Sequence, residues 1–128
     1  MVDYYWFSVL VAANALLLVA LTVNVSRHRM KNKISLGDGD NKQLREAMRA
    51  HGNNTEQFPV YALVILAMTF LGASSSLLSG LVIGYTLSRV IHAYGMLNNH
   101  FPTRRLGMGV TYILQLVAPV MLIVELME

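Results

Sequence analysis

Residues 49 to 59 combine basic, acidic and amide side chains at a spacing that fits one face of a helix. Arg49, Asn53 and Glu56 stand at positions i, i+4 and i+7, so a helix would align them, with Arg45 one turn earlier on the same face. A guanidinium, an amide and a carboxylate side by side are suited to binding a small polar molecule. We therefore expect this segment to contribute to a ligand site.

A second polar group interrupts an otherwise apolar segment further along the chain. Arg89 and His92 stand at i and i+3 and share a helix face. Glu56 lies 17 residues before Ala73, and Arg89 lies 13 residues after Ser76. At 1.5 Å per residue these are roughly 26 Å and 20 Å along two antiparallel helices. The counting predicts an Arg89–Glu56 ion pair, which either fixes helix register only or belongs to the ligand site.

Basic side chains outnumber acidic ones around this group, which implies an anionic partner. The basic residues are Arg27, Arg45, Arg49, Arg104 and Arg105. Lipid headgroups are one candidate partner, and a small molecule carrying carboxylates is the other. Headgroups need only a basic rim, without aligned Asn, Glu and His side chains, so we favour the small molecule. Tyr94 either reaches this pocket with its hydroxyl or lies in the aromatic belt at the membrane surface.

Metal chemistry and thiol chemistry by the protein itself are not expected. The chain has no cysteine, and its four histidines lack the spacing of metal ligands. Asp38-Gly39-Asp40 starts like a calcium loop, but Lys42 and Arg49 occupy positions that need oxygen ligands. Any thiol that reacts in this site has to come from a substrate.

The elements that position these residues are membrane helices. Apolar residues make up 55% of the 128 residues and charged residues 13%, against about 25% charged in a soluble domain. The length favours one domain, residues 1–128, and the apolar runs predict an all-α integral membrane four-helix bundle. The expected spans are 4–25, 58–72, 77–97 and 106–124.

The distribution of charge predicts how the bundle sits in the membrane. Every Lys and Arg except Arg89 lies between Arg27 and Arg49 or at Arg104 and Arg105. These are the first and third connections, which share one side of a four-span protein. The positive-inside rule places segments 27–57 and 98–105 in the cytoplasm and both termini outside. The same rule explains the net charge of +3 without nucleic acid as a partner.

The residues resemble a known family. Arg49-x-His51-x-Asn53-x-x-Glu56, followed by Pro59, resembles the signature of the MAPEG family, the membrane-associated proteins in eicosanoid and glutathione metabolism. The loop that begins at Leu36 is similar to that of small bacterial members, and Arg89-x-x-His92 and Arg104-Arg105 also match in order. The resemblance covers the whole chain. It implies a homotrimer in the bacterial inner membrane that binds glutathione between subunits near the cytoplasmic face.

The resemblance also implies roles for individual residues. Glutathione would be held by Arg27, Arg49, Asn53, Glu56 and His92, and we add Arg89 and Tyr94 to the predicted binding set. Arg105 would stabilise the glutathione thiolate, because a guanidinium favours ionisation of a thiol whose ordinary pKa is about 8.5. The expected function is a glutathione transferase, with peroxidase activity also open. Its electrophile, a hydrophobic small molecule, would enter from the lipid bilayer.

Two departures keep a non-catalytic interpretation open. Gly52 replaces an arginine and Met96 a tyrosine found in many members, and Tyr94 could compensate only through rotation of its helix. The family also includes a lipid-binding scaffold, so a ligand-binding protein without turnover is the alternative. A small multidrug transporter is disfavoured, because the first span has no acid and the arginines near Glu56 would repel cations.

Overall fold

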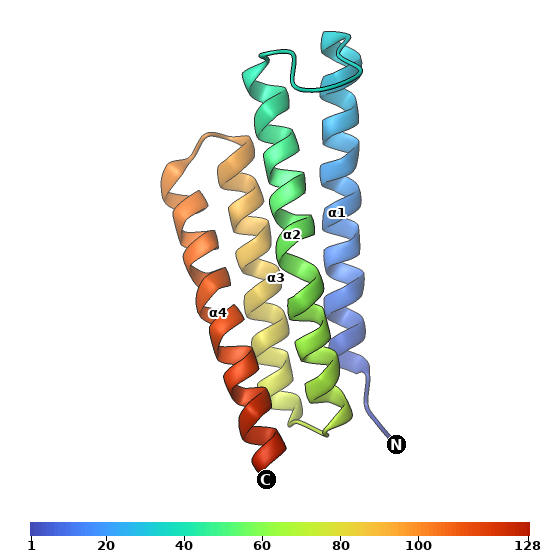
Figure 1. The fold of residues 1–128 in the computed structure, drawn as a ribbon, viewed down its shortest axis with the longest axis vertical. Helices are drawn as coiled ribbons and strands as arrows, with labels where there is room; N and C mark the ends of the chain where they lie inside the picture. The colour runs from blue at the N-terminus through green and yellow to red at the C-terminus, as the bar shows by residue number, and fades with distance from the viewer.

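Four helices account for almost the whole chain in the computed structural model, which describes residues 1–128. They are α1 (Tyr5–Asn32), α2 (Lys42–Phe70), α3 (Ser75–Leu97) and α4 (Phe101–Met127). The helices alternate in direction, and both termini lie at the same end of the bundle (Figure 1). Each consecutive pair is in contact, α1 also contacts α3, α2 also contacts α4, and α1 and α4 do not touch. The predicted all-α four-helix architecture is confirmed.

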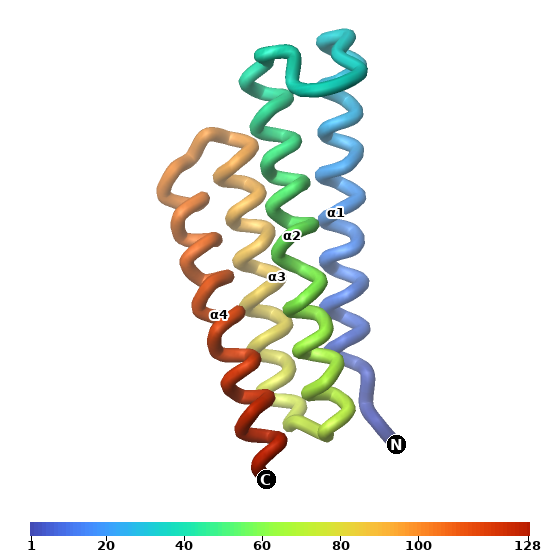
Figure 2. The backbone as a smooth tube through the Cα atoms, viewed as in Figure 1, coloured from blue at the N-terminus to red at the C-terminus, as the bar shows by residue number.

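At the end of the bundle opposite the termini, α1 and α2 extend further than α3 and α4. We call this end, with the 33–41 and 98–100 loops and the adjoining helix ends, the basic end. With 28 and 29 residues, α1 and α2 are roughly 42 and 44 Å long. Their connection extends beyond that of α3 and α4 (Figure 2). The result is a step at the basic end.

Two of the helices are apolar and long enough to cross a membrane by composition alone, namely α1 and α4. The other two carry more polar side chains, and several of these are buried inside the bundle, including Asn54, Ser88 and Arg89. These residues lower the mean hydropathy of α2 and α3, and the neighbouring helices shield them from lipid. Each predicted span lies on one of the four helices, although Tyr4 precedes the start of α1 and residues 71–72 follow the end of α2.

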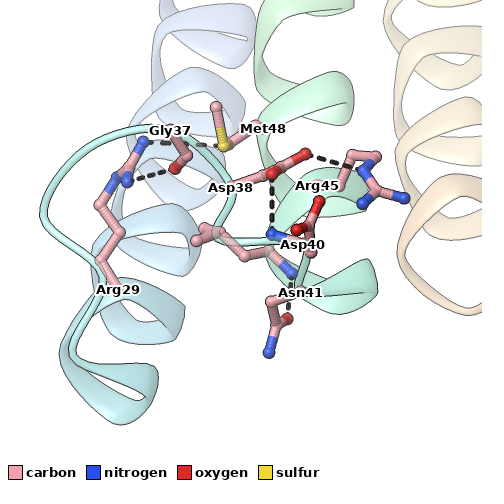
Figure 3. A network of polar contacts seen from close by, with 8 residues as sticks. Arg29, Gly37, Asp38, Asp40, Asn41, Arg45 and Met48 are labelled. Carbon is pink, nitrogen blue, oxygen red and sulfur yellow. Dashed lines mark hydrogen bonds and ion pairs between the residues drawn. The ribbon is translucent and has the colours of Figure 1, made fainter.

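Polar caps and a structured loop define the start of α2. Asn41 caps this helix, with its Oδ1 accepting a hydrogen bond from the Leu44 amide at 2.9 Å. Arg29 donates from Nη1 to the Gly37 carbonyl at 2.8 Å, and Arg45 Nε donates to Asp38 Oδ2 at 2.8 Å (Figure 3). The hydrogen bond from Arg45 holds the pKa of the Asp38 carboxyl below its ordinary value. The loop between α1 and α2 is therefore tied to both helices.

Two apolar clusters fill the bundle, one toward each end. The larger cluster, toward the termini, includes Leu10, Tyr61, Ile65, Leu81 and Tyr85. The smaller one, toward the basic end, consists of Leu21, Ala50, Ala93 and Met96 with the half-buried Leu17. The buried polar residues Asn54, Ser88 and Arg89 lie between the residues of these two clusters along α2 and α3. This polar layer is the part of the fold that can carry chemistry.

Two glycines let α3 and α4 approach each other closely. A Cβ atom on Gly107 would lie 2.5 Å from the His92 backbone nitrogen, and one on Gly95 would lie 2.3 Å from that of Arg104. Small residues recur at Gly80, Gly84 and Ser88 along α3, and α4 packs against only part of this stripe. A Cβ on Gly84 would come within 3.2 Å of Leu114, whereas Gly80 faces open space.

Candidate functional site

Arg89 is the centre of the buried polar layer. Its side chain is 1% exposed, yet no carboxylate lies within ion-pair distance. Nε donates to Asn54 Oδ1 at 3.1 Å, and Nη2 donates to Asn53 Oδ1 and contacts His92 Nδ1 at 3.3 Å. Nη1 reaches Thr111 Oγ1 at 3.5 Å and the Met108 sulfur at 3.8 Å. Neutral acceptors from α2, α3 and α4 therefore solvate a buried cation.

The close α3–α4 contact positions the α4 side of this network. Thr111 lies one turn after Gly107 and accepts or donates a hydrogen bond with Ser88 Oγ at 2.9 Å. It also donates to the Gly107 carbonyl at 2.8 Å, which fixes its rotamer. Because Gly107 has no side chain, Thr111 and Met108 come near enough to contact Arg89. The backbone approach and the buried network depend on each other.

The predicted Arg89–Glu56 ion pair is wrong. Glu56 is exposed and makes no ion pair. Arg89 instead donates hydrogen bonds to Asn53 and Asn54, which precede Glu56 on α2. Successive helical residues are 100° apart, so Glu56 points about 200° away from the buried Asn54. Counting residues along the helix gave the right depth but could not give the azimuth. The amides, which are shorter and uncharged, occupy the interior face.

Several predicted site residues lie on the outside of a single chain. Arg49 and Glu56 are exposed on α2, while Asn53 between them is half-buried and turns toward Arg89. Arg27 is exposed, and its only side-chain hydrogen bond is to Asn24 at 3.4 Å. Arg105 is exposed and stacks over the Phe101 ring, with 5.5 Å from its Cζ to the ring centroid. One chain therefore brings together Asn53, Arg89 and His92, but not the complete predicted set.

Two clefts occupy the step at the basic end, and Glu46 lines both. The larger, about 310 Å³, lies among α1, α2 and α3 and includes Arg27 and His28. The smaller, about 120 Å³, lies among α2, α3 and α4 and includes Met96 and Arg104. Arg27 and Arg104 line these spaces without an acidic partner within 4.0 Å, because the only ion pairs of the chain are Lys42–Glu46 and Arg45–Asp38.

A third cleft opens between α2 and α4 beside Glu56. It has a volume of about 350 Å³. The polar end contains Glu56, Gln57 and Gln115, and Gln115 Nε2 donates to Gln57 Oε1 at 2.7 Å. Tyr61, Val60, Val64 and Pro119 form the remaining wall. The cleft thus joins a carboxylate to an apolar surface that continues along the membrane helices.

Tyr94 lies on a different face of α3 from Met96, the position at which the family resemblance implies a tyrosine. Tyr94 is 57% exposed, whereas Met96 is buried in the cluster with Leu21 and Ala50. These residues are two apart on α3, so they point about 200° apart. Tyr94 does not replace a side chain at Met96 within one chain.

Three participants in the network were not singled out from the sequence: Asn54, Met108 and Thr111. Arg104 was noted only as a basic residue, although of the two neighbouring arginines it is the one that lines the cleft among α2, α3 and α4. A signal for Thr111 does exist, because it is a polar residue in an apolar run and follows Gly107 by one helical turn. Asn54 had no distinguishing signal beside the equally polar Asn53.

Comparison with known proteins gives consistent matches. The model of the MAPEG family matches residues 7–124. The chain is 34% identical over 99 residues to "Inner membrane protein YecN" of Escherichia coli strain K12, covering 77% of this chain and 76% of that protein. The protein of the same name from Escherichia coli O6:H1 strain CFT073 matches equally, with 34% identity over 99 residues. No solved structure matches the chain.

Proposed function

The chain belongs to the MAPEG family and is an integral membrane protein, and from that premise we propose that it is a membrane-bound glutathione transferase. Its relative in Escherichia coli is named an inner membrane protein, and we propose the same location for this chain. The basic end faces the cytoplasm in this proposal, where glutathione is available. The reaction joins the glutathione sulfur to a hydrophobic electrophile that arrives from the bilayer.

The observation that carries the proposal is the set of unpaired guanidinium groups at the basic end. Arg27, Arg49, Arg104 and Arg105 have no acid within 4.0 Å, while the two ion pairs of the chain use Lys42 and Arg45. Glutathione carries two carboxylates and one ammonium group, so arginines together with the unpaired Glu56 match its charges. An anionic lipid would match the arginines but not the acid.

Arg105 supplies the chemical activation in this proposal. The thiol of glutathione loses its proton to solvent, and the guanidinium stabilises the resulting thiolate. The sulfur then donates an electron pair to an electrophilic carbon, and the leaving group departs with the electrons of its bond. With a lipid hydroperoxide, two glutathione molecules are oxidised to the disulfide while the hydroperoxide is reduced to an alcohol and water.

The cleft between α2 and α4 is the proposed path for the hydrophobic substrate. Glu56 marks its polar end, and Tyr61, Val64 and Pro119 provide apolar contact at membrane depth. A substrate that slides along this surface reaches the charged residues of α2 without crossing water.

A homotrimer is part of the proposal because one chain leaves the site open. Arg49 and Glu56 lie on the outer face of α2, and Arg105 lies on the outer face of α4. Charged groups at the edge of the bilayer core are costly when they face lipid. Packing of a second copy against this face shields them and gathers basic groups from two chains around one ligand.

Turnover by purified protein tests the function directly. We expect conjugation of glutathione to a hydrophobic aryl halide by the detergent-solubilised protein, followed by ultraviolet absorbance. Arg105→Ala should lower kcat about tenfold or more, because a shift of one pKa unit in the thiol corresponds to about 1.4 kcal/mol. Lys31→Ala, which removes a charge at the exposed end of α1, is the control and should keep its rate.

One observation favours the alternative of a non-catalytic ligand-binding protein. Met96 is buried where many family members have a tyrosine, and Tyr94 faces outward. Saturable glutathione binding without turnover of either an aryl halide or a lipid hydroperoxide would support this alternative. Absence of glutathione binding would exclude both.

A further inference from the structure

The guanidinium of Arg89 has no donor left for a ligand. Arginine has five N–H donors and no acceptor. Arg89 makes five contacts within the chain, to Asn53, Asn54, His92, Thr111 and Met108. Its side chain is also 1% exposed. The sequence predicts that Arg89 itself holds the ligand. Because all five of its donors are used within the chain, we assign it an indirect role instead.

The contact with His92 has a direct consequence for the histidine ring. Arg89 Nη2 lies 3.3 Å from His92 Nδ1, and only the arginine nitrogen can be the donor. Nδ1 must then accept, so it carries no hydrogen. A neutral imidazole with a bare Nδ1 has its hydrogen on Nε2. A doubly protonated ring would direct an N–H at a group that has no acceptor.

The other ring nitrogen is available. His92 Nε2 makes no hydrogen bond within the chain, although the residue is only 3% exposed. It is also absent from the fully enclosed polar atoms that lack a partner, which are Asn14 Oδ1, His28 Nδ1 and Tyr85 Oη. Nε2 therefore keeps access to the surface. An N–H that reaches the surface from a largely buried ring, without an internal partner, needs an acceptor from outside the chain.

We propose that Arg89 is a positioning residue that fixes His92 as the Nε2–H tautomer, so that His92 presents one oriented donor to an acceptor atom of the ligand. Asn53, Asn54 and Thr111 support this role indirectly, because their contacts hold the guanidinium plane of Arg89 in place. This inference deepens the glutathione proposal and rests on it for the identity of the ligand. It assigns to His92 a neutral donor function rather than a charged or metal-binding one.

Nitrogen-15 NMR of the imidazole rings in the ligand-free, full-length protein in detergent tests the tautomer. Comparison with His92→Gln assigns the ring signals. We expect the His92 spectrum to show a protonated Nε2 and an unprotonated Nδ1 near neutral pH. A spectrum with the hydrogen on Nδ1, or with both nitrogens protonated, overturns the proposal. This measurement needs no ligand, so its outcome is independent of whether glutathione binds.

Two substitutions at His92 separate the donor from the structural contact. In His92→Gln the amide nitrogen takes the place of Nε2, and in His92→Asn the amide oxygen takes the place of Nδ1 and keeps the contact with Arg89. Glutathione affinity by calorimetry should stay within about threefold for His92→Gln and fall at least about tenfold for His92→Asn. A purely structural histidine gives the reverse order, which overturns the donor role. Failure of the wild-type protein to bind glutathione refutes the proposed function, while the NMR result still decides the positioning role.

Discussion

Replacing Gly107 by alanine tests whether the close α3–α4 approach holds the buried network together. A Cβ atom at this position would lie 2.5 Å from the His92 nitrogen, 2.7 Å from the His92 Cα and 2.7 Å from the Ser88 oxygen. All three are backbone atoms of α3, so no side chain can rotate away. Relief requires α4 to move outward by about 1 Å to reach an ordinary contact distance.

The expected cost follows from these distances. Overpacking against a rigid neighbour costs about 1–3 kcal/mol. Outward movement of α4 also weakens the Ser88–Thr111 hydrogen bond of 2.9 Å, which contributes about 1 kcal/mol. Alanine is more favourable than glycine inside a helix by about 1 kcal/mol, which offsets part of the loss. We expect Gly107→Ala to lower the free energy of unfolding by about 2 kcal/mol.

The assay is reversible unfolding in mixed detergent followed by circular dichroism. Gly109→Ala is the matched control, since it lies two residues along the same helix and a Cβ there meets nothing within 4 Å. Its stability should be unchanged or higher by up to about 1 kcal/mol. Equal stabilities for the two variants would refute the idea that the approach of α3 and α4 is set by Gly107.

Further predictions concern polar groups elsewhere in the bundle and in the 33–41 loop. Tyr85 Oη is enclosed without a partner, whereas Tyr61 Oη donates to the Leu81 carbonyl at 2.8 Å, so Tyr85→Phe should raise stability by about 1 kcal/mol and Tyr61→Phe should lower it by a similar amount in the same unfolding assay. Because the pKa of Asp38 is lowered, its ion pair stabilises the 33–41 loop at neutral pH, and the protection of this loop against hydrogen exchange, relative to the intrinsic rate at each pH, should fall only below about pH 4; equal protection in Arg45→Gln across this range would contradict it. Asn54→Asp gives Arg89 a carboxylate partner and should raise the midpoint of thermal unfolding; a lower midpoint would show that the neutral acceptors already suffice.

The fold was predictable because it depends on long, strong patterns. Four apolar runs separated by basic or polar connections predicted four helices. The hydrogen-bond partners of Arg89 were not predictable in the same way. Depth along a helix follows from counting, but the choice between Asn54 and Glu56 as the partner of Arg89 depends on rotation about the helix axis. That rotation is set by packing of neighbouring helices.

The site was predictable in composition and only partly in geometry. The motif around Asn53 and the pair Arg89 and His92 do meet in space. Arg49, Glu56 and Arg105 stay on the outside of one chain, where a second copy would cover them in the proposed trimer. A single sequence contains no direct signal for which face a second copy covers. Rotation of α4 about its axis decides that Arg104 lines the cleft among α2, α3 and α4 while Arg105 stacks over Phe101, and the sequence contains no signal for that rotation.

Calorimetric titration of glutathione into the purified protein in detergent tests the central claim most directly. We predict saturable binding, with an affinity that falls at least about tenfold in Arg49→Ala and is unchanged in Lys33→Ala, since a charge-assisted hydrogen bond is worth about 1.5–3 kcal/mol. Both substitutions remove one exposed positive charge, so a nonspecific electrostatic effect would weaken glutathione binding equally in the two variants. No saturable binding, or equal affinities for the two variants, would contradict a glutathione pocket at the basic end.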